Sequence, residues 1–420
     1  MQVGGTPESG DRFGSALAAA DFNNDGFADL AAGASGEDVG GAGDAGAVSV
    51  LYGSSGGLTT SGGQLFTQVG SPAEDFDNFG WALAAGDFNH DGFADLAAGA
   101  PGEAVGARGF AGAVSVLYGS AGGLSTTGGR LFTQVAGTVE GGDQFGWALA
   151  AGDFNHDSFL DLAAGAPGEA IGNAGGAGAV SVLPGSAGGL TATGGQLFTQ
   201  VGGTVEGGDQ FGAALAAGDF NGDEFADLAA GAPSETVGGA VDAGAVSMLL
   251  GSVGGLTVSG GRLFTQVGGT PERFDVFGFA LAAGDFNHDG FADLAASAPL
   301  EDVGSLDDAG TVSALPGSAG GLTTSGARLF TQVAGTVEAG DEFGEQLASG
   351  DFNNDGLADL AAAAPNEEVG TVPLAGAVSV LQGAAGGLTA SGGQLFTQNS
   401  PGVPGVAEPF DQFGGLEIVF

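Results

Sequence analysis

The sequence repeats itself with a period of 66 residues. The acidic segment DFNNDGFADLAAGA begins at Asp21, and close copies follow, without insertion or deletion, at Asp87, Asp153, Asp219, Asp285 and Asp351. A Phe-Gly pair, the segment GAVSVLYG with its variants, and the segment LFTQ keep the same spacing. A fixed period of this length is typical of a chain built from stacked structural repeats.

Each unit contains four short runs of strand type. In the second unit these runs are FGWALAAGDF, FADLAAGAP, AGAVSVLYG and LFTQ, and Gly, Pro, Asn and Asp separate them. No stretch shows the helical period of 3.6 residues. Four strands per unit, in six units, predict an all-β chain that forms a β-propeller of four-stranded antiparallel blades.

The whole chain, residues 1–420, is expected to form a single propeller domain. Its six complete units are expected at 13–78, 79–144, 145–210, 211–276, 277–342 and 343–408. The opening MQV resembles the end of a fourth strand, and the closing FGGLEIVF resembles a first strand. Residues 409–420 are therefore a partial seventh unit or a closing strand, and six or seven blades are both open.

Small and large apolar residues recur at fixed places in each unit. Ala and Gly fill the first two runs, which suits inner strands that crowd a central axis. Phe13, Phe22, Phe27 and Phe66, with their copies, are predicted to form the core between neighbouring blades.

The charge of the chain limits its partners. It has 50 acidic residues, six Arg and no Lys, which gives a net charge of −44. Nucleic acids and anionic membranes need basic surfaces, so the composition excludes them and favours cations. With no Cys there are no disulfides and no thiolate metal sites. No apolar run reaches the roughly 18 residues of a membrane span, so no membrane insertion is expected.

The acidic segment predicts a calcium loop. Oxygen donors at alternate positions suit a hard cation, position 7 offers a backbone carbonyl, and Gly26 at position 6 allows a sharp turn. The predicted ligands, at positions 1, 3, 5, 7 and 9 of each loop, are Asp21, Asn23, Asp25, Phe27, Asp29; Asp87, Asn89, Asp91, Phe93, Asp95; Asp153, Asn155, Asp157, Phe159, Asp161; Asp219, Asn221, Asp223, Phe225, Asp227; Asp285, Asn287, Asp289, Phe291, Asp293; Asp351, Asn353, Asp355, Leu357 and Asp359. Up to six Ca²⁺ ions are expected. Ser158 and Glu224 replace the Gly, which predicts strain or weaker binding there.

The pairing of FG with DFNNDGFADLAAGA and GAVSVLYG resembles the FG-GAP repeat, the blade of integrin α-subunit propellers and of bacterial FG-GAP repeat proteins. The resemblance covers nearly the whole chain. It implies that the acidic loop joins the first and second strands and holds calcium on one face. It also implies an extracellular or cell-surface binding or adhesion module, as a part of a larger secreted or surface protein. The resemblance further implies that a protein or glycan ligand docks on the opposite face. MQVGGTPESG has neither a basic region nor an apolar stretch, so these residues are not expected to be a signal peptide.

Repeated acids also mark the loops at the opposite end, such as Asp11, Glu37 and their copies. Two interpretations stay open for them: a negative ring that attracts cations, or local capping and solvation. Arg108, Phe110, Leu306 and Leu374, in loops that differ between units, are candidates for recognition.

No catalytic constellation is found, so no enzyme is expected. The three His residues, His90, His156 and His288, occupy position 4 of acidic loops and are expected to face solvent rather than bind zinc. Two further functions remain as alternatives. One is a carbohydrate-binding, lectin-like propeller, although Trp81 and Trp147 follow FG and are expected to be structural. The other is a natural or designed repeat scaffold without a ligand.

Overall fold

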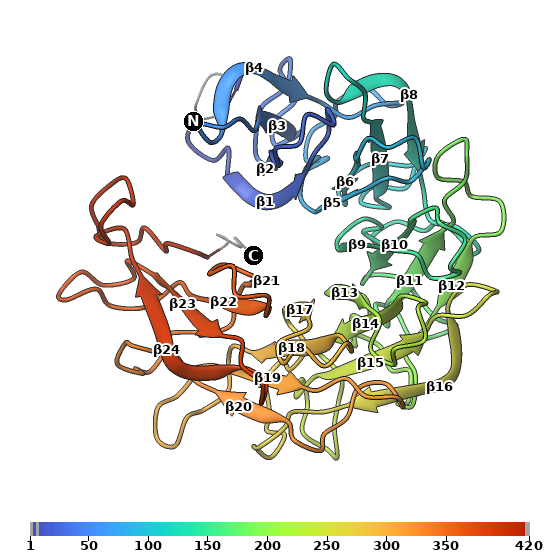
Figure 1. Cartoon of the computed structure of the whole chain (residues 1–420). Helices are drawn as coiled ribbons and strands as arrows, with labels where there is room; N and C mark the ends of the chain where they lie inside the picture. Colours follow the sequence, from blue (N-terminus) through green and yellow to red (C-terminus); the bar gives the residue numbers. More distant parts are fainter. Residues whose placement is uncertain (1–2, 6–7, 416–420) are drawn as a thin grey trace. The chain divides into compact units, whose positions relative to one another are not determined.

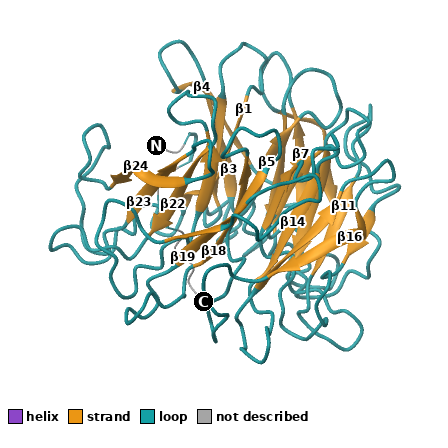
Figure 2. Cartoon of the chain, turned by 60° about the horizontal axis from the view of Figure 1, so that its bottom comes forward, coloured by secondary structure: helices purple, strands orange, loops and turns teal. Residues whose placement is uncertain are grey.

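A computed structural model describes residues 3–5 and 8–415 of the chain. These residues form 24 β-strands and no helix, which confirms the all-β prediction (Figure 2). Accordingly, no helix in this part of the chain is long and apolar enough to cross a membrane. Met1 and Gln2 of MQV, and Leu416–Phe420 of the closing segment, lie outside the described residues.

The chain divides into two compact units of three blades each. The first unit ends at Thr199 and also takes Val205–Ala213, whereas the second takes Gln200–Thr204 and continues from Ala214. Each blade is a sheet of four strands in sequence order, and every neighbouring pair is antiparallel (Figure 1). The predicted blade of a β-propeller, present in six copies, is thus confirmed.

The strands of the first unit are β1 (Phe13–Ala20), β2 (Asp29–Ala34), β3 (Ala47–Tyr52), β4 (Thr59–Phe66), β5 (Leu83–Gly86), β6 (Asp95–Ala100), β7 (Ala113–Tyr118), β8 (Ser125–Phe132), β9 (Leu149–Gly152), β10 (Asp161–Ala166), β11 (Ala179–Leu183) and β12 (Gln196–Phe198). The strands of the second unit are β13 (Leu215–Gly218), β14 (Asp227–Ala232), β15 (Ala245–Leu250), β16 (Thr257–Phe264), β17 (Leu281–Gly284), β18 (Asp293–Ala298), β19 (Thr311–Leu315), β20 (Arg328–Phe330), β21 (Leu347–Gly350), β22 (Asp359–Ala364), β23 (Ala377–Gln382) and β24 (Thr389–Phe396).

The second strand of a blade is buried along its whole length, as β6 shows. Its sequence DLAAGA is therefore a continuous run of small and apolar residues instead of an alternating one. Gly99 explains why the run must stay small: a Cβ atom there would lie 2.0 Å from the carbonyl oxygen of Gly146 in the next blade. Neighbouring blades thus approach backbone to backbone at this point.

The observed boundaries differ from the predicted runs at two places. In the second to sixth blades the first strand starts after the Phe-Gly pair, because the Phe of this pair bonds to the preceding blade. The Gly still bonds to its own sheet, since Gly146 donates its N–H to the carbonyl of Gly165 at 2.9 Å. Phe145, for example, donates its N–H to the carbonyl of Ala111 at 3.0 Å and forms a parallel bridge with Gly112. At the other edge, β8 begins at Ser125 and ends at Phe132, so Thr133 and Gln134 of LFTQ lie beyond the strand.

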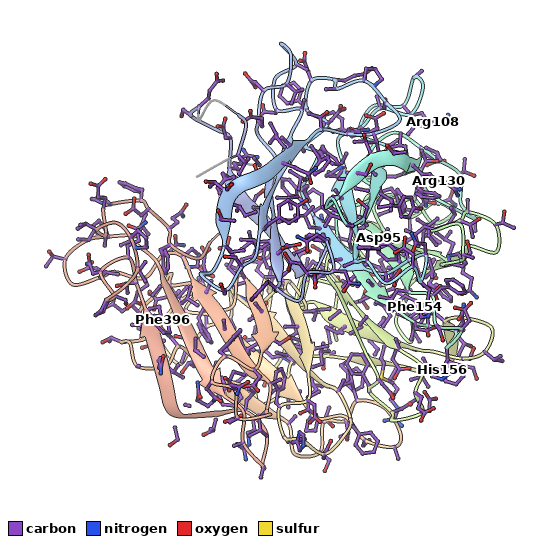
Figure 3. All side chains as sticks on the ribbon, turned by 45° about the horizontal axis from the view of Figure 1, so that its top comes forward. Asp95, Arg108, Arg130, Phe154, His156 and Phe396 are labelled. Carbon is purple, nitrogen blue, oxygen red and sulfur yellow. The ribbon has the colours of Figure 1, made fainter. Side chains whose placement is uncertain are left out.

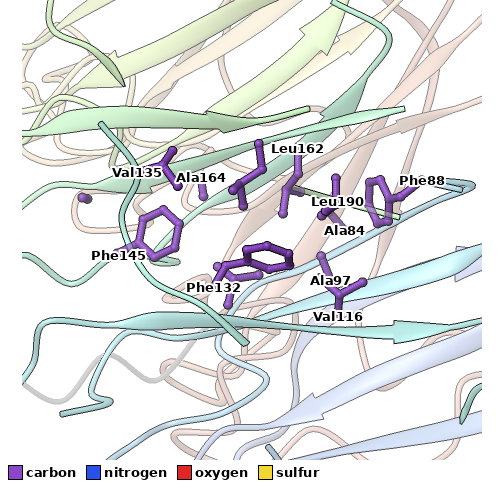
Figure 4. Packing of buried hydrophobic residues seen from close by; sticks show 13 residues of the cluster. Ala84, Phe88, Ala97, Val116, Phe132, Val135, Phe145, Leu162, Ala164 and Leu190 are labelled. Carbon is purple, nitrogen blue, oxygen red and sulfur yellow. The ribbon is translucent and has the colours of Figure 1, made fainter. Parts of the chain in front are cut away.

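The core lies between neighbouring blades of each unit. One cluster joins Phe88, Val116 and Phe132 of the second blade to Phe145 and Leu162 of the third, and all five side chains are at most 8% exposed (Figure 4). Full burial of such a side chain contributes about 1.5–3 kcal/mol. These clusters connect the blades into one body within each unit.

The expected core role was correct for Phe22 and Phe66, which are 0% and 7% exposed. It was also correct for the copies of Phe13, which are fully buried: Phe79, Phe145, Phe211, Phe277 and Phe343. It was wrong for Phe27 and for Phe13 itself. Phe27 is 42% exposed because position 7 of the acidic loop lies at a blade end rather than between sheets. Phe13 is 38% exposed because it pairs with Ala34 of its own sheet instead of joining a preceding blade.

Residues near both ends of the described chain lie outside any strand, yet they make hydrogen bonds that recur in the other blades. Val3 donates its N–H to the hydroxyl of Ser49 at 3.3 Å, as Val69 does to Ser115 in the next blade at 3.3 Å. Phe413 donates its N–H to the carbonyl of Ala375 at 2.9 Å, the same bond that Phe145 makes with Ala111. The terminal segments therefore resemble the end of a fourth strand and the start of a first strand in their contacts.

Candidate metal loops

The six acidic loops connect the first and second strands of their blades. In the first loop the carboxylate of Asp21 accepts the N–H groups of Asp25 and Gly26, at 3.0 and 2.8 Å. Asn23 Oδ1 accepts the N–H of Asp25 at 2.9 Å, and Asp25 Oδ1 accepts that of Phe27 at 3.0 Å. These side-chain bonds to nearby backbone groups wrap positions 1, 3 and 5 into one tight turn.

The same wrapped turn recurs along the chain. In the loops that begin at Asp87, Asp153, Asp219 and Asp285, positions 1, 3 and 5 accept the equivalent N–H groups at 2.8–3.2 Å. The sixth loop differs at one residue, since Asn353 donates its side-chain amide to Gln382 at 2.8 Å. Its first acid still accepts the N–H of Gly356, and that bond lowers the pKa of Asp351.

The acid at position 9 is buried, whereas the acids at positions 1 and 5 are not. Asp29, Asp95, Asp161, Asp227, Asp293 and Asp359 are at most 3% exposed. Asp95, labelled in Figure 3, accepts the N–H of Phe88 through Oδ2 at 3.0 Å and the N–H of Gly119 through Oδ1 at 2.9 Å. Burial raises the pKa of Asp95 to about 7, although both hydrogen bonds oppose the rise. Position 9 therefore ties the start of the loop to the end of the third strand.

Position 6 requires a left-handed backbone. Gly26 and Gly92 have φ of +89°, which costs glycine nothing. Ser158 and Glu224 have φ of +74°, which strains a residue with a Cβ atom and agrees with the predicted strain. Both keep the bond from their N–H to the first acid of the loop, at 2.9 Å, so the loop path is preserved. His90, His156 and His288 at position 4 are exposed, as expected.

The donor set of these loops suits a hard cation. All the predicted side-chain ligands offer oxygen, which Ca²⁺ prefers, and the wrapped turn fixes their backbone. Beyond burial, the charges of Asp25 and Asp21 raise the pKa of Asp29, so the acids of one loop affect one another. As the side chains lie, however, no group of three or more His, Asp or Glu within the described residues is gathered closely enough to hold a metal. Binding would require the carboxylates to turn toward a common centre.

The repeated acids at the opposite blade ends are buried, not arranged as a solvent-facing ring. Asp77 and Glu103 are 1% and 3% exposed, and Asp77 Oδ2 caps the N–H of Glu74 at 2.7 Å. Asp143, Asp275 and Asp341 make the same cap at 2.6 Å. Burial raises the pKa of Asp77 to about 7, and the neighbouring Glu103 adds to the rise. The capping interpretation of these acids is therefore the better one.

The sequence analysis did not identify the buried glutamine that lies beside these acids in several blades. Gln134, the last residue of LFTQ, is 6% exposed and lies beside Glu169. Burial raises the pKa of Glu169 to about 7, and the amide of Gln134 opposes this rise. Gln266 and Gln332 act in the same way on Glu301 and Glu367. Because LFTQ recurs in all six units, its period was the signal that could have identified this residue.

The recognition candidates differ in exposure. Arg108, labelled in Figure 3, lies exposed in its loop, and Phe110 nearby is 51% exposed with φ of +55°. Leu306 and Leu374 are half-buried. Trp81 and Trp147, from neighbouring blades, pack on each other with ring centroids 4.6 Å apart, which gives the pair a structural contact.

The family model of the FG-GAP repeat matches residues 13–51, 79–117, 145–183, 211–249, 277–315 and 343–381. These six segments make up more than half of the chain and contain every acidic loop described above. The chain belongs to the FG-GAP repeat family, as the resemblance of its motifs indicated.

Two kinds of curated relatives share this repeat. Phosphatidylinositol-glycan-specific phospholipase D of Bos taurus is 36% identical over 188 residues, which are 42% of this chain and 22% of that protein. Integrin alpha-V of Gallus gallus is 30% identical over 239 residues, 55% of this chain and 21% of that protein. The chain thus matches about a fifth of the length of either relative, and the activity of the whole relative does not transfer with the match.

Two solved structures resemble the chain distantly. A mutant of AofleA from Arthrobotrys oligospora has a TM-score of 0.47 at 10% identity, over 92% of this chain and 87% of that one. The NanB sialidase from Streptococcus pneumoniae also has a TM-score of 0.47, at 7% identity, over 87% of this chain and 67% of that one. At these scores the likeness says nothing about what this chain binds.

Proposed function

We propose that this chain is a calcium-binding, non-enzymatic binding module of the extracellular space or cell surface. The observation that carries the proposal is the wrapped acidic turn, which holds oxygen donors in the same backbone path in successive blades. Each turn binds one Ca²⁺ ion through positions 1, 3 and 5 and the carbonyl of position 7. Extracellular calcium modules bind Ca²⁺ with dissociation constants of roughly 10⁻⁴–10⁻³ M. Sites as weak as these are occupied at the calcium concentration outside the cell, which supports an extracellular location.

The ligand of the module, a protein or a glycan, docks at the blade ends opposite the acidic loops. The support is the loop that carries Arg108 and Phe110, because this loop varies between units and exposes an aromatic ring on a rigid sheet. Relatives of both kinds carry the same repeat within longer proteins, which agrees with a module that works beside other domains.

Calorimetric titration of the metal-free protein with Ca²⁺ tests the proposal. We expect saturable binding of up to six ions, and the loss of one ion in the variant Asp91→Ala. A matched control is Glu368→Gln, which removes an exposed acid outside the loops and should leave the stoichiometry unchanged. Absence of saturable binding up to about 10 mM Ca²⁺, well above the affinities of weak extracellular sites, would contradict the proposal.

A further inference from the structure

A small polar set is buried between neighbouring blades of each unit, at the blade ends opposite the acidic turns. We call it the buried acid–amide set; between the second and third blades it comprises Gln134, Asp143 and Glu169. Gln134 follows β8 of the second blade, whereas Asp143 precedes β9 and Glu169 follows β10 of the third. The three side chains are 6%, 1% and 5% exposed. The set therefore lies inside the first unit and joins two of its blades.

The same set recurs at the other three interfaces between neighbouring blades of one unit. Its recurrence shows that it belongs to the blade interface and not to one particular loop. The members of these three sets, all at most 8% exposed, are Gln68, Asp77 and Glu103; Gln266, Asp275 and Glu301; and Gln332, Asp341 and Glu367.

Several polar atoms of each set lack a hydrogen-bond partner. Among residues 3–5 and 8–415, neither amide atom of Gln134 is paired, and neither is Oε2 of Glu169. The other unpaired atoms are both amide atoms of Gln68, Gln266 and Gln332, and Oε2 of Glu103, Glu301 and Glu367. Folded proteins pair nearly all their buried polar atoms, so the same unpaired atoms in four copies indicate a missing ligand.

The unpaired groups face a common point. A Cβ atom on Gly269 would lie 3.0 Å from Nε2 of Gln266 and 3.0 Å from Oε1 of Glu301. A Cβ atom on Gly335 would likewise lie 2.6 Å from Nε2 of Gln332 and 3.4 Å from Oε1 of Glu367. The amide thus points toward the carboxyl of the next blade, and glycine keeps a further side chain out of this place.

The two acids of a set also lie close to each other. Burial raises the pKa of Glu169 to about 7, and the charge of Asp143 raises it further. Glu301 and Asp275 show the same relationship, again with a pKa of about 7 for the glutamate. Two adjacent buried carboxylates repel each other, and a cation bound between them would remove this repulsion.

We propose that each buried acid–amide set binds one Ca²⁺ ion, so that the chain has a second kind of calcium site. Two carboxylates balance the charge of a divalent ion. Calcium accepts about six to eight oxygens, among them carboxylates, glutamine carbonyls, backbone carbonyls and water. The glutamine presents Oε1 when its amide turns over, because the two amide atoms occupy nearly the same space. These four ions are additional to those of the acidic turns and do not depend on them.

The set can bind an ion without losing its structural role. Asp143 caps the N–H of Glu140 through Oδ2 at 2.6 Å, which leaves Oδ1 for the ion. Glu140 itself is exposed, so the set lies just below the surface at this blade end. Its charge, within a chain of net charge −44, attracts cations to the entrance.

Terbium luminescence can detect these sites separately from the acidic turns. Tb³⁺ replaces Ca²⁺ in oxygen sites and emits when a nearby tryptophan is excited. The chain has two tryptophans, and Trp81 and Trp147 follow Asp77 and Asp143 by four residues each. Their rings pack on each other, with centroids 4.6 Å apart. The acidic turns lie at the other ends of the blades. We therefore expect tryptophan-sensitised emission from the protein with Tb³⁺, and its loss when excess Ca²⁺ is added.

Variants of the acids identify the site. Glu169→Gln should lose about half of the emission, because it disables one of the two sets beside the tryptophan pair. The double variant Glu103→Gln with Glu169→Gln should lose nearly all of it. Glu140→Gln is the matched control, since it removes an exposed acid beside the set but no ligand. Two results would overturn the proposal: no sensitised emission from the unaltered chain, or emission that Asp91→Ala of an acidic turn removes and Glu169→Gln does not.

Thermal melts give an independent measurement at pH 8. Ca²⁺ that binds only the folded protein raises its melting temperature. Glu169→Gln lacks one of these ions, so the rise between chelator and Ca²⁺ should be smaller than in the unaltered chain and in Glu140→Gln. An equal rise in Glu169→Gln and the unaltered chain would show that the set binds no Ca²⁺.

Discussion

The backbone N–H of Gly119 lies 2.9 Å from Oδ1 of Asp95 and donates a hydrogen bond to it. Gly119 directly follows the third strand of the blade, and Asp95 is the ninth residue of the acidic loop. The equivalent bond occurs in all six blades at 2.8–2.9 Å. One acid of each predicted metal loop therefore ties its loop to the end of the third strand of the blade.

This double role predicts that Asp95→Ala destabilises the protein independently of calcium. The substitution leaves the buried N–H groups of Phe88 and Gly119 without an acceptor, at a cost of about 1–3 kcal/mol for each. Urea unfolding followed by tryptophan fluorescence, with excess chelator and with Ca²⁺, measures the effect. The matched variant Asp91→Ala removes an exposed acid of the same loop and should change stability mainly when Ca²⁺ is present. Equal effects of both variants in chelator would contradict the assignment.

Glu224→Gly is expected to stabilise the protein. Glu224 has φ of +74°, and this left-handed backbone costs a residue with a Cβ atom about 1–2 kcal/mol. Glycine removes this strain, but it also gives the unfolded chain more conformational freedom, which offsets part of the gain in stability. We expect a net gain of about 1 kcal/mol or less, measured as a shift of the urea midpoint. The reverse change Gly92→Glu should lose a similar amount, and a destabilised Glu224→Gly would show that the side chain matters more than the backbone.

The buried acids predict an unusual pH dependence. Burial raises the pKa of Glu169 and of Glu301 to about 7, above the usual 4.5 of an unfolded chain. Between these values the folded state binds more protons than the unfolded state, so stability falls as the pH rises from about 4.5 to 7. In chelator, the melting temperature should therefore be higher at pH 5 than at pH 8.

The variant Glu169→Gln separates this effect from that of the other acids. Glutamine has the shape of the protonated carboxyl and never ionises, so the variant should melt higher than the unaltered chain at pH 8 and about equally at pH 5. The exposed Glu368→Gln serves as the control and should change the melt at pH 8 much less, because Glu368 acts on the buried Glu367 only through its charge. A Glu169→Gln variant that loses stability at pH 8 would show that the ionised carboxylate is the stabilising form.

Arg328 of the fifth blade forms a hydrogen bond with the sixth blade. Its Nη1 donates to the carbonyl of Leu388 at 2.9 Å, as Arg130 does to Leu190 at 3.2 Å. Three of the six units carry glutamine at this position instead: Gln64, Gln196 and Gln394. Arg328→Ala should cost about 1 kcal/mol, the usual contribution of one such bond, and Arg328→Gln should cost less. Chemical unfolding measures the free energy of unfolding of both variants. If both variants lose the same amount of stability, the polar contact to the next blade is not what stabilises the protein at this position.

Much of the fold could be predicted because each unit repeats the same local signals. Runs such as GAVSVLYG, bounded by Gly and Asn-Asp turns, fix the strands in every copy, and the 66-residue period fixes their number. The spacing of Asp21, Asn23 and Asp25 also predicted that they would share a turn. The Phe of the Phe-Gly pair was misplaced because its N–H bonds to the preceding blade, which no local pattern reveals.

The sequence alone determined the strands, the antiparallel four-stranded blade and the acidic turns, because these depend on residues close together in the chain. Only the tertiary structure decided which of the phenylalanines are buried. Phe22 and Phe27 lie five residues apart in the same acidic loop, yet Phe22 is fully buried and Phe27 is 42% exposed. The physical reason is that burial depends on the neighbouring sheet: Phe22 packs in the cluster between the first and second blades, whereas Phe27 lies at a blade end.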